Sequence, residues 1–424
     1  MFDKIMTDSI NKHTTVLVPL EVWPFSSPYL AKAKKHVDLG LLAESLIYYD
    51  QVLFNINTVE EFEELLEWFS SQGKLDLFFS LLRERTLRPF YYHFMTSAIN
   101  NQGTFSIWNI NTPQENNQSD FIRLIVYRSN LAKFMNSRKR AQLYRIIEEN
   151  LINEMAEGYD PPVENSRLAL KQTERINLLT QAYVDHIFKN FQPGIKPPEI
   201  HSTILNSESD QFTINYNYDF KKLDELLGLP GYFRGEMPAI GEAHSNNLIW
   251  TSSKYGWDLY LGDVMSTVVG NKLFEVDQST NKPQKVISKL TEKVEYPNIR
   301  ELVNQGIIDI DLVMKVRSNS SKFRKWLQQE SERDRDEIVE YHQEVTKASG
   351  ITKFTSSTLK LFGNLLQYGP PFYAAIDPTP LTGVIVAGAN IGGSFTKSIG
   401  ETIGKDWKPL VFGDWVIKEV SKKK

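Results

Sequence analysis

Histidine and carboxylate side chains are the groups in this 424-residue chain that could move protons or hold a metal ion, and it has seven histidines. On a helix, a second such group must lie three or four positions from the first, because those positions share a face. Around His186, His244 and His342 these positions hold neither a carboxylate nor another histidine. Local spacing therefore predicts no metal site, and a site assembled from distant segments stays open.

Sequence signatures of the common enzyme classes give no further candidate. The motifs HExxH, GxSxG and GxGxxG do not occur, and the absence of cysteine excludes thiolate catalysis, disulfides, zinc ribbons and iron–sulfur clusters. The stretch GETIGKD at 400–406 is similar to a phosphate loop. It has three residues rather than four between its glycines, and Asp406 stands where a magnesium-binding Ser or Thr is needed. No cofactor is predicted.

A positional argument supplies candidate catalytic residues near the N-terminus. Ligands of open parallel sheets bind outside the carboxyl ends of the strands. In the strands expected here, the residues at these ends are Glu21, Trp23, Asn55, Asn57 and His93. Glu21 and His93 could act as an acid–base pair. The alternative is that all five are ordinary loop residues.

A basic stretch is the candidate contact for phosphates. Between Asp120 and Glu148 the chain has seven basic residues and no acidic one, with Tyr127 and Tyr144 nearby. The predicted nucleic-acid or phosphate contacts are Arg138, Lys139, Arg140 and Arg145. Such a surface would bind with salt-sensitive affinity. The alternative is a solvated helix face that pairs with acidic neighbours elsewhere.

A glycine-rich segment, LTGVIVAGANIGGSFTKSIGETIG at 381–404, forms the second arm of a predicted hairpin at 361–404. Neither arm reaches the roughly 20 apolar residues of a membrane-spanning helix. Conditional insertion or self-assembly stays open, because the pairs Gly388/Gly392 and Gly400/Gly404 would permit close helix contact. Glycine costs a helix about 1 kcal/mol each relative to alanine, so the alternative is a segment buried tightly in a core.

Strands and helices that would position these residues are predicted to alternate in the N-terminal region. Apolar runs at 15–20, 51–56 and 87–93 predict buried strands, and the capping box TVEE at 58–61 predicts the start of a helix between two of them. The runs TFSIWNI and FIRLIVY, at 104–110 and 121–127, are further candidate strands that could extend the same sheet. We expect an α+β, helix-dominated fold with a small N-terminal α/β unit of mostly parallel strands.

Later segments are expected to be mainly helical. The helices are predicted at about 130–157, 165–191, 219–228, 238–275, 298–304, 309–317 and 320–348, with a half-buried strand at 212–218. Stretches rich in proline and polar residues predict boundaries between three regions. These are an N-terminal α/β domain with the basic helix (1–160), a mixed helical middle region (161–282) and a helical C-terminal region with the hairpin (283–424).

Composition and charge limit the cellular compartment and the kinds of binding partner that are expected. A hydrophobic fraction of 41% is ample for packed cores, and the net charge of -4 gives no general attraction to nucleic acid or anionic lipid. Polar residues interrupt the N-terminus too early for a signal peptide, so a cytoplasmic protein is expected. The abundance of Asn, Ile and Lys favours a bacterial source.

Three functions remain as hypotheses. The first is a non-enzymatic interaction or assembly protein, for example a stress, toxin or phage-defence effector acting through the 361–404 hairpin. The second is a hydrolase that acts on nucleotides or nucleic acid with a site built from scattered residues. The third is an adaptor whose charged 320–348 helix docks a protein partner through Phe323 or Trp326.

Overall fold

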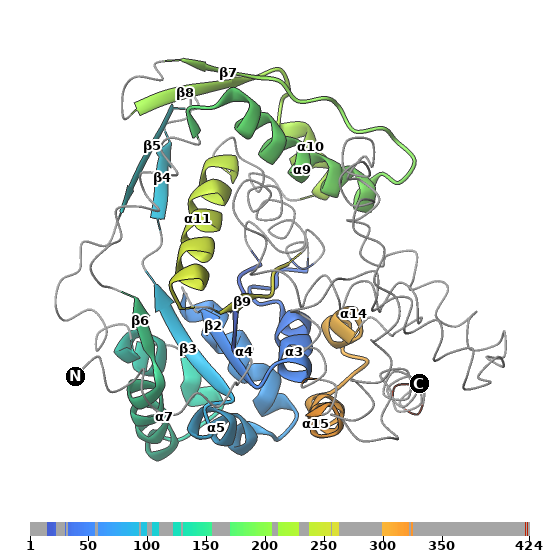
Figure 1. The fold of residues 1–424 in the computed structure, drawn as a ribbon. Coiled ribbons are helices and arrows are strands. Elements are labelled where there is room, and N and C mark those ends of the chain that lie inside the picture. The colour runs from blue at the N-terminus through green and yellow to red at the C-terminus, as the bar shows by residue number, and fades with distance from the viewer. Residues whose placement is uncertain are drawn as a thin grey trace, which may run out of the picture. The chain divides into compact units, whose positions relative to one another are not determined.

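The computed structural model in Figure 1 shows an α+β protein in which helices dominate and a sheet of parallel strands is built on the N-terminal region. It describes residues 15–22, 30, 33–55, 58–92, 95–99, 104–109, 122–128, 130–154, 170–205, 211–228, 237–255, 257–262, 299–321, 324, 420 and 422. The chain divides into two compact units, residues 1–281 and 282–424. The division into three regions stays a prediction.

Five parallel strands form the central sheet of the first unit, in the order β6-β3-β2-β1-β9. They are β1 (Thr15–Pro19), β2 (Gln51–Asn55), β3 (Leu87–Tyr92), β6 (Ile152–Glu154) and β9 (Asp258–Leu259). The chain adds β2, β3 and β6 on one side of β1 and returns to place β9 on the other. The strand order therefore reverses between β1 and β9, which is a topological switch point.

Helices cover both faces of this sheet. Leu17, Leu53 and Leu259 share a face and a hydrophobic core with α11 (Met237–Tyr255). Because side chains alternate along a strand, Tyr260 points the opposite way from Leu259, and its hydroxyl lies 2.8 Å from Oε2 of Glu44 on α3 (Leu39–Tyr48). The sheet therefore has α11 on one face and α3 on the other.

Two more helices lie between β2 and β3 in the sequence, and a third precedes β6. These are α4 (Val59–Ser71), α5 (Leu75–Arg83) and α7 (Ser137–Asn150). The capping box predicted for α4 is confirmed, because the Thr58 side chain accepts from Glu61 N and the Glu61 side chain accepts from Thr58 N. Each bond satisfies a backbone donor that the helix leaves open.

We expect Thr58→Ala to lower the free energy of unfolding by about 1 kcal/mol, because it removes the acceptor for the Glu61 N–H. Urea unfolding followed by far-UV circular dichroism measures the change. Ser71→Ala, at the exposed end of the same helix, is the matched control and should change stability by less than about 0.5 kcal/mol. Equal effects of the two substitutions would show that the cap does not stabilise α4.

A second, antiparallel sheet has the order β4-β5-β8-β7. Its strands are β4 (Met95–Ile99), β5 (Thr104–Asn109), β7 (Ser202–Leu205) and β8 (Gln211–Tyr216). The predicted strand TFSIWNI is thus a strand, β5, but it belongs to this sheet and does not extend the parallel one. The strand predicted in the middle region is confirmed as β8.

The expectation of a strand at 121–127 is wrong. Residues 122–128 are helical and include a π-helical turn, η1 (Leu124–Arg128), followed by a 3-10 turn, η2 (Asn130–Lys133). A short apolar run does not distinguish a strand from a buried helical turn, and here burial of Ile122, Ile125 and Val126 was achieved by a helix. The segment predicted as helical at 238–275 likewise contains a strand, β9, after α11 ends.

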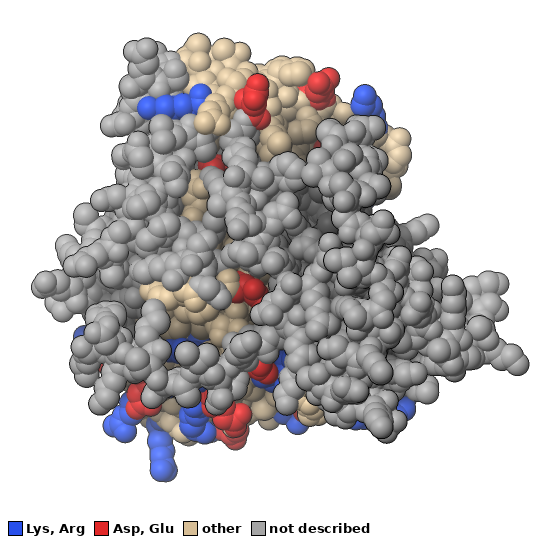
Figure 2. Space-filling model, in the orientation of Figure 1, with Lys and Arg blue, Asp and Glu red and all other residues tan. Residues whose placement is uncertain are grey.

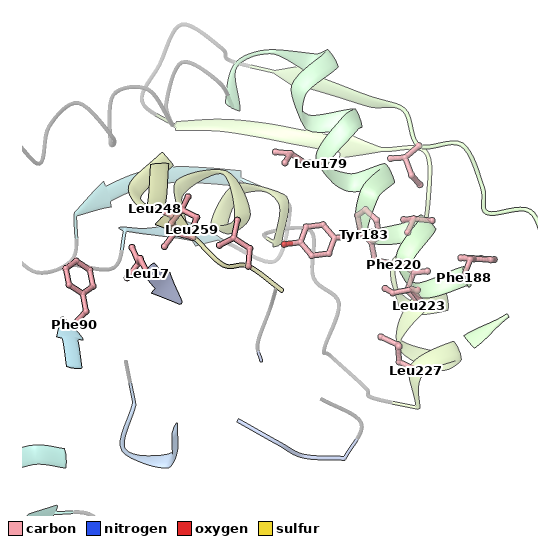
Figure 3. Close-up of a cluster of buried hydrophobic side chains, with 14 of the residues drawn as sticks. Leu17, Phe90, Leu179, Tyr183, Phe188, Phe220, Leu223, Leu227, Leu248 and Leu259 are labelled. Carbon is pink, nitrogen blue, oxygen red and sulfur yellow. The ribbon is translucent and has the colours of Figure 1, made fainter. Parts of the chain in front are cut away.

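The core of the first unit lies between the parallel sheet and the helices α9 (Thr173–Phe191), α10 (Lys221–Leu227) and α11. Figure 3 shows Leu17, Leu248 and Leu259 close together, and Tyr183, Phe188 and Leu223 grouped on α9 and α10. The predicted end of α10 at Gly228 is confirmed, because this glycine has φ +64°, a left-handed conformation that side chains rarely adopt.

The second unit contributes two described helices, α14 (Ile299–Asn304) and α15 (Ile310–Asn319), at the positions predicted from sequence. Asp309 caps α15 by accepting from Leu312 N at 2.9 Å.

The 361–404 hairpin lies outside the described residues, as does the predicted 320–348 helix apart from positions 320, 321 and 324. Within the described parts of the chain, no helix combines the length and apolar character needed to cross a membrane.

Candidate acid–base site at the carboxyl edge of the parallel sheet

Glu21 and His244 meet at the carboxyl end of β1. Glu21 Oε1 lies 2.8 Å from His244 Nε2. Both residues are almost fully buried, with 5% of Glu21 and 2% of His244 exposed. A carboxylate and an imidazole at this distance inside a protein form a pair that can hold or transfer a proton.

The backbone around Glu21 is fixed by a short antiparallel pairing. Glu21 bridges Val37, and Val22 N donates to His36 O at 3.0 Å. Asp38 N donates to Leu20 O at 2.9 Å on the other side of the same bridge. The chain that leaves β1 is therefore held extended, and alternation places Glu21 on the face of the sheet that carries Leu17 and α11.

The direction of α11 explains why His244 reaches this edge. The helix leads directly into β9 and so runs antiparallel to the strands. Leu248 packs in the core with Leu17 and Leu259, at the level where β9 pairs with β1 (Figure 3). His244 lies one helical turn earlier on the same side of α11, which brings it toward the carboxyl end of β1 and Glu21.

Asn55, at the carboxyl end of β2, supports this arrangement. It is 1% exposed, and its Oδ1 accepts a hydrogen bond from Leu20 N at 3.1 Å. Leu20 directly follows Pro19, and Pro19 is the residue of β1 that pairs in register with Asn55. Asn55, which the sequence placed at the sheet edge, therefore connects the end of β2 to Leu20, the residue before Glu21, by a hydrogen bond.

The polar segment of α11, residues 242–247, is buried on every side. All residues from 241 to 248 are buried, although 242–247 include Glu242, Ser245, Asn246 and Asn247 beside His244. Asn246 Nδ2 donates to Glu242 Oε1 at 3.2 Å. Buried polar groups are costly unless they are hydrogen-bonded, so a helix turn made almost entirely of them is unusual in a core. Figure 1 shows α11 above the parallel sheet, with β4 and β5 on its left and α9 on its right.

The Glu21 carboxylate has unused hydrogen-bonding capacity. Both oxygens are buried, and neither accepts a well-aligned hydrogen bond from the described residues, although Oε1 is close to His244 Nε2. An ionised carboxylate only accepts hydrogen bonds, so it is suited to a ligand with hydroxyl or amino donors, or to a water molecule. Catalytic hydrogen bonds that are poorly aligned without substrate often tighten when the substrate binds.

The structure brings some predicted residues together and leaves others untested. Glu21 and Asn55 share one edge, whereas Trp23, Asn57 and His93 lie outside the described residues. Whether Glu21 and His93 act together therefore stays a prediction. The four glycines proposed for assembly, Gly388, Gly392, Gly400 and Gly404, are also outside the described ranges.

His244 was missed by the sequence analysis, which considered only partners on the same helix. A signal was present in the run GEAHSNN at 241–247, whose density of polar residues is unusual in the middle of a helix that packs on a sheet. Its real partner comes from the other end of the first unit. In the part of the chain that is described, no three His, Cys, Asp or Glu side chains are grouped so that they could hold a metal ion.

The basic residues on α7 are partly paired. Lys139 Nζ lies 2.8 Å from Asp76 Oδ1 of α5, while Arg138 and Arg145 are exposed and Arg140 is half-buried. Figure 2 shows basic and acidic side chains interspersed along the lower edge of the molecule. The role of these residues in phosphate binding stays a prediction.

Comparison with known proteins found no match to this chain among protein-family models, curated proteins or solved structures.

Proposed function

We propose that the chain is a hydrolase of nucleotides that uses Glu21 and His244 as its acid–base pair. The observation that carries this proposal is the buried 2.8 Å contact between Glu21 Oε1 and His244 Nε2 beside the strand-order reversal of a parallel sheet. Open parallel sheets bind their ligands at such switch points, and nucleotides are frequent among those ligands.

In the proposed reaction, His244 takes a proton from a water molecule as the water oxygen attacks the substrate. The Nε2 side of the ring faces Glu21 Oε1 at 2.8 Å. The carboxylate of Glu21 stabilises the resulting imidazolium, and the interaction is strengthened by burial away from water. The imidazolium then returns the proton to the leaving group as the bond to it breaks, so the protein ends the cycle unchanged.

A turnover panel tests the proposal. The full chain is incubated with nucleoside mono-, di- and triphosphates and with dinucleotides, with and without Mg²⁺, and products are separated by chromatography. We expect hydrolysis of at least one compound by the wild type. If the folded wild-type protein cleaves no member of the panel under either condition, the proposal is wrong.

The interaction hypothesis and the adaptor hypothesis concern residues outside the described ranges and stay predictions. For the hairpin, we expect Gly388→Leu combined with Gly392→Leu to abolish conditional assembly or membrane leakage, because bulky side chains prevent close helix contact. Size-exclusion chromatography and liposome leakage measure these activities. Full retention of both by the double variant would remove the hairpin from consideration.

A further inference from the structure

Two tyrosines form an aromatic pair at the surface of the first unit, away from the polar segment of α11 in sequence. Tyr127 of η1 and Tyr144 of α7 have ring centroids 5.8 Å apart with an interplanar angle of 34°. Tyr127 is 47% exposed, and among the described residues the other large exposed apolar side chains are aliphatic: Leu178, Ile195 and Leu205. An aromatic ring held at the surface by a second ring offers a flat face to a ligand.

Arginines flank both rings. Arg123 precedes Tyr127 by four residues, and Arg140 precedes Tyr144 by four on α7, so the latter two share a helix face. Arg140 Nε is buried and has no hydrogen-bond partner within the described structure. Arg138 and Arg145 are exposed on α7 as well. We call Arg123, Tyr127, Arg140, Tyr144 and Arg145 the tyrosine–arginine surface.

Acidic side chains of α4, α5 and α7 also lie near this surface. Asp76 pairs with Lys139, which is not part of it, and Tyr144 Oη lies 3.4 Å from Glu148 Oε1. Glu63 Oε1 accepts a hydrogen bond from the backbone N–H of Asn130. From 121 to 147 the sequence contains no carboxylate side chain, and the nearest carboxylates on the same elements are Glu148 and Glu149 at the end of α7.

We propose that the tyrosine–arginine surface binds single-stranded nucleic acid, with a base stacked on Tyr127 and phosphates contacted by the arginines. Single strands expose the faces of their bases, and a stack on an aromatic side chain accepts any base. A duplex hides these faces, and an acidic peptide would use the arginines without needing the ring. The π-helical turn that carries Tyr127 is a rare element that is frequently found at functional sites.

Fluorescence anisotropy with a labelled oligothymidylate tests the proposal on the full chain without any turnover, so its result is independent of the proposed hydrolase activity. We expect binding that weakens as salt rises from 50 to 200 mM, as phosphate contacts require. Tyr127→Ala should weaken binding about 5- to 150-fold, the equivalent of about 1–3 kcal/mol per stacked base. Tyr127→Phe keeps the ring and should bind like the wild type.

Charge variants distinguish the contribution of the arginines to binding from a general electrostatic attraction. Arg145→Gln should weaken binding and reduce the slope of log affinity against log salt by about 1. Lys196→Gln removes an exposed charge from a different part of the first unit and is the matched control, which should bind like the wild type. Thermal unfolding of each variant confirms that it folds.

Several outcomes would overturn the proposal. They are failure of the folded wild type to bind the oligonucleotide, equal binding by Tyr127→Ala, and binding of a matched duplex as tight as that of the single strand. Binding to anionic phospholipid vesicles in place of the oligonucleotide would also overturn it, and would assign the arginines to a lipid surface.

Discussion

Glu21→Gln is expected to lower the turnover of the nucleotide substrate by a factor of about 10²–10⁴, the usual contribution of a positioned acid–base group. Glutamine keeps the size of the side chain and can occupy the same buried position. It removes the negative charge that lies 2.8 Å from His244 Nε2, so an imidazolium formed during the reaction loses its stabilising partner. The loss should appear in kcat more than in KM, because this charge interaction forms in the transition state.

Steady-state kinetics on the compound found in the turnover panel measure this loss. Glu61→Gln is the matched control, because Glu61 is also buried and a glutamine at this position preserves the capping box of α4. We expect the control to keep wild-type kinetics. If Glu21→Gln folds with the stability of the wild type and turns over at the same rate, Glu21 does not take part in the chemistry.

His244→Gln should give a loss at least as large as Glu21→Gln, since it removes the group that accepts the proton. The two substitutions combined should cost no more than the larger single effect, because residues that act as one unit are non-additive. Independent, multiplied losses would indicate that the two side chains contribute separately.

Local patterns were enough to predict the elements that frame this site. The apolar runs that became β1, β2 and β3 were recognisable because each is short, apolar and bounded by helix signals. Their alternation with helices predicted parallel pairing, and parallel pairing placed Glu21 and Asn55 at one edge. The rule for ligand position in such sheets therefore identified Glu21, one of the two residues of the proposed acid–base pair.

The other half could not be predicted because it depends on tertiary contacts between distant segments. β9 has two residues, too few to show an alternating pattern, yet its pairing with β1 fixes where α11 lies. Without β9, nothing in the sequence brings His244 to the end of β1. The error at 121–127 has a related cause, because the burial of Ile125 and Val126 is set by packing rather than by period.

Asp258, the first residue of β9, is expected to make the stability of the first unit depend on pH. It pairs in register with Val16, and alternation directs it away from Leu259, toward the face that carries α3 and Tyr49. Burial raises its pKa from 3.8 to about 7. Burial also raises the pKa of Tyr49 well above its usual value, and the negative charge of Asp258 adds to that effect.

The sign of the dependence follows from which state holds the proton. In the unfolded chain the Asp258 carboxyl ionises near pH 4, whereas in the folded protein it stays protonated until about pH 7. Between these values the folded state binds more protons, so the free energy of unfolding falls as pH rises and levels off above pH 7. A difference of about three pH units corresponds to at most about 4 kcal/mol.

Asp258→Asn removes this titration and should therefore be about as stable as the wild type at pH 4 and up to about 4 kcal/mol more stable at pH 8. Urea unfolding at intervals between these pH values measures both curves. Asp76→Asn, at an exposed carboxyl of α5, is the matched control for the change from aspartate to asparagine. A curve for Asp258→Asn that runs parallel to the wild type would mean that this carboxyl is already ionised in the folded protein at pH 4. The start of β9 would then be open enough to water to hydrate a charge, and the burial that also raises the pKa of Tyr49 would be incomplete.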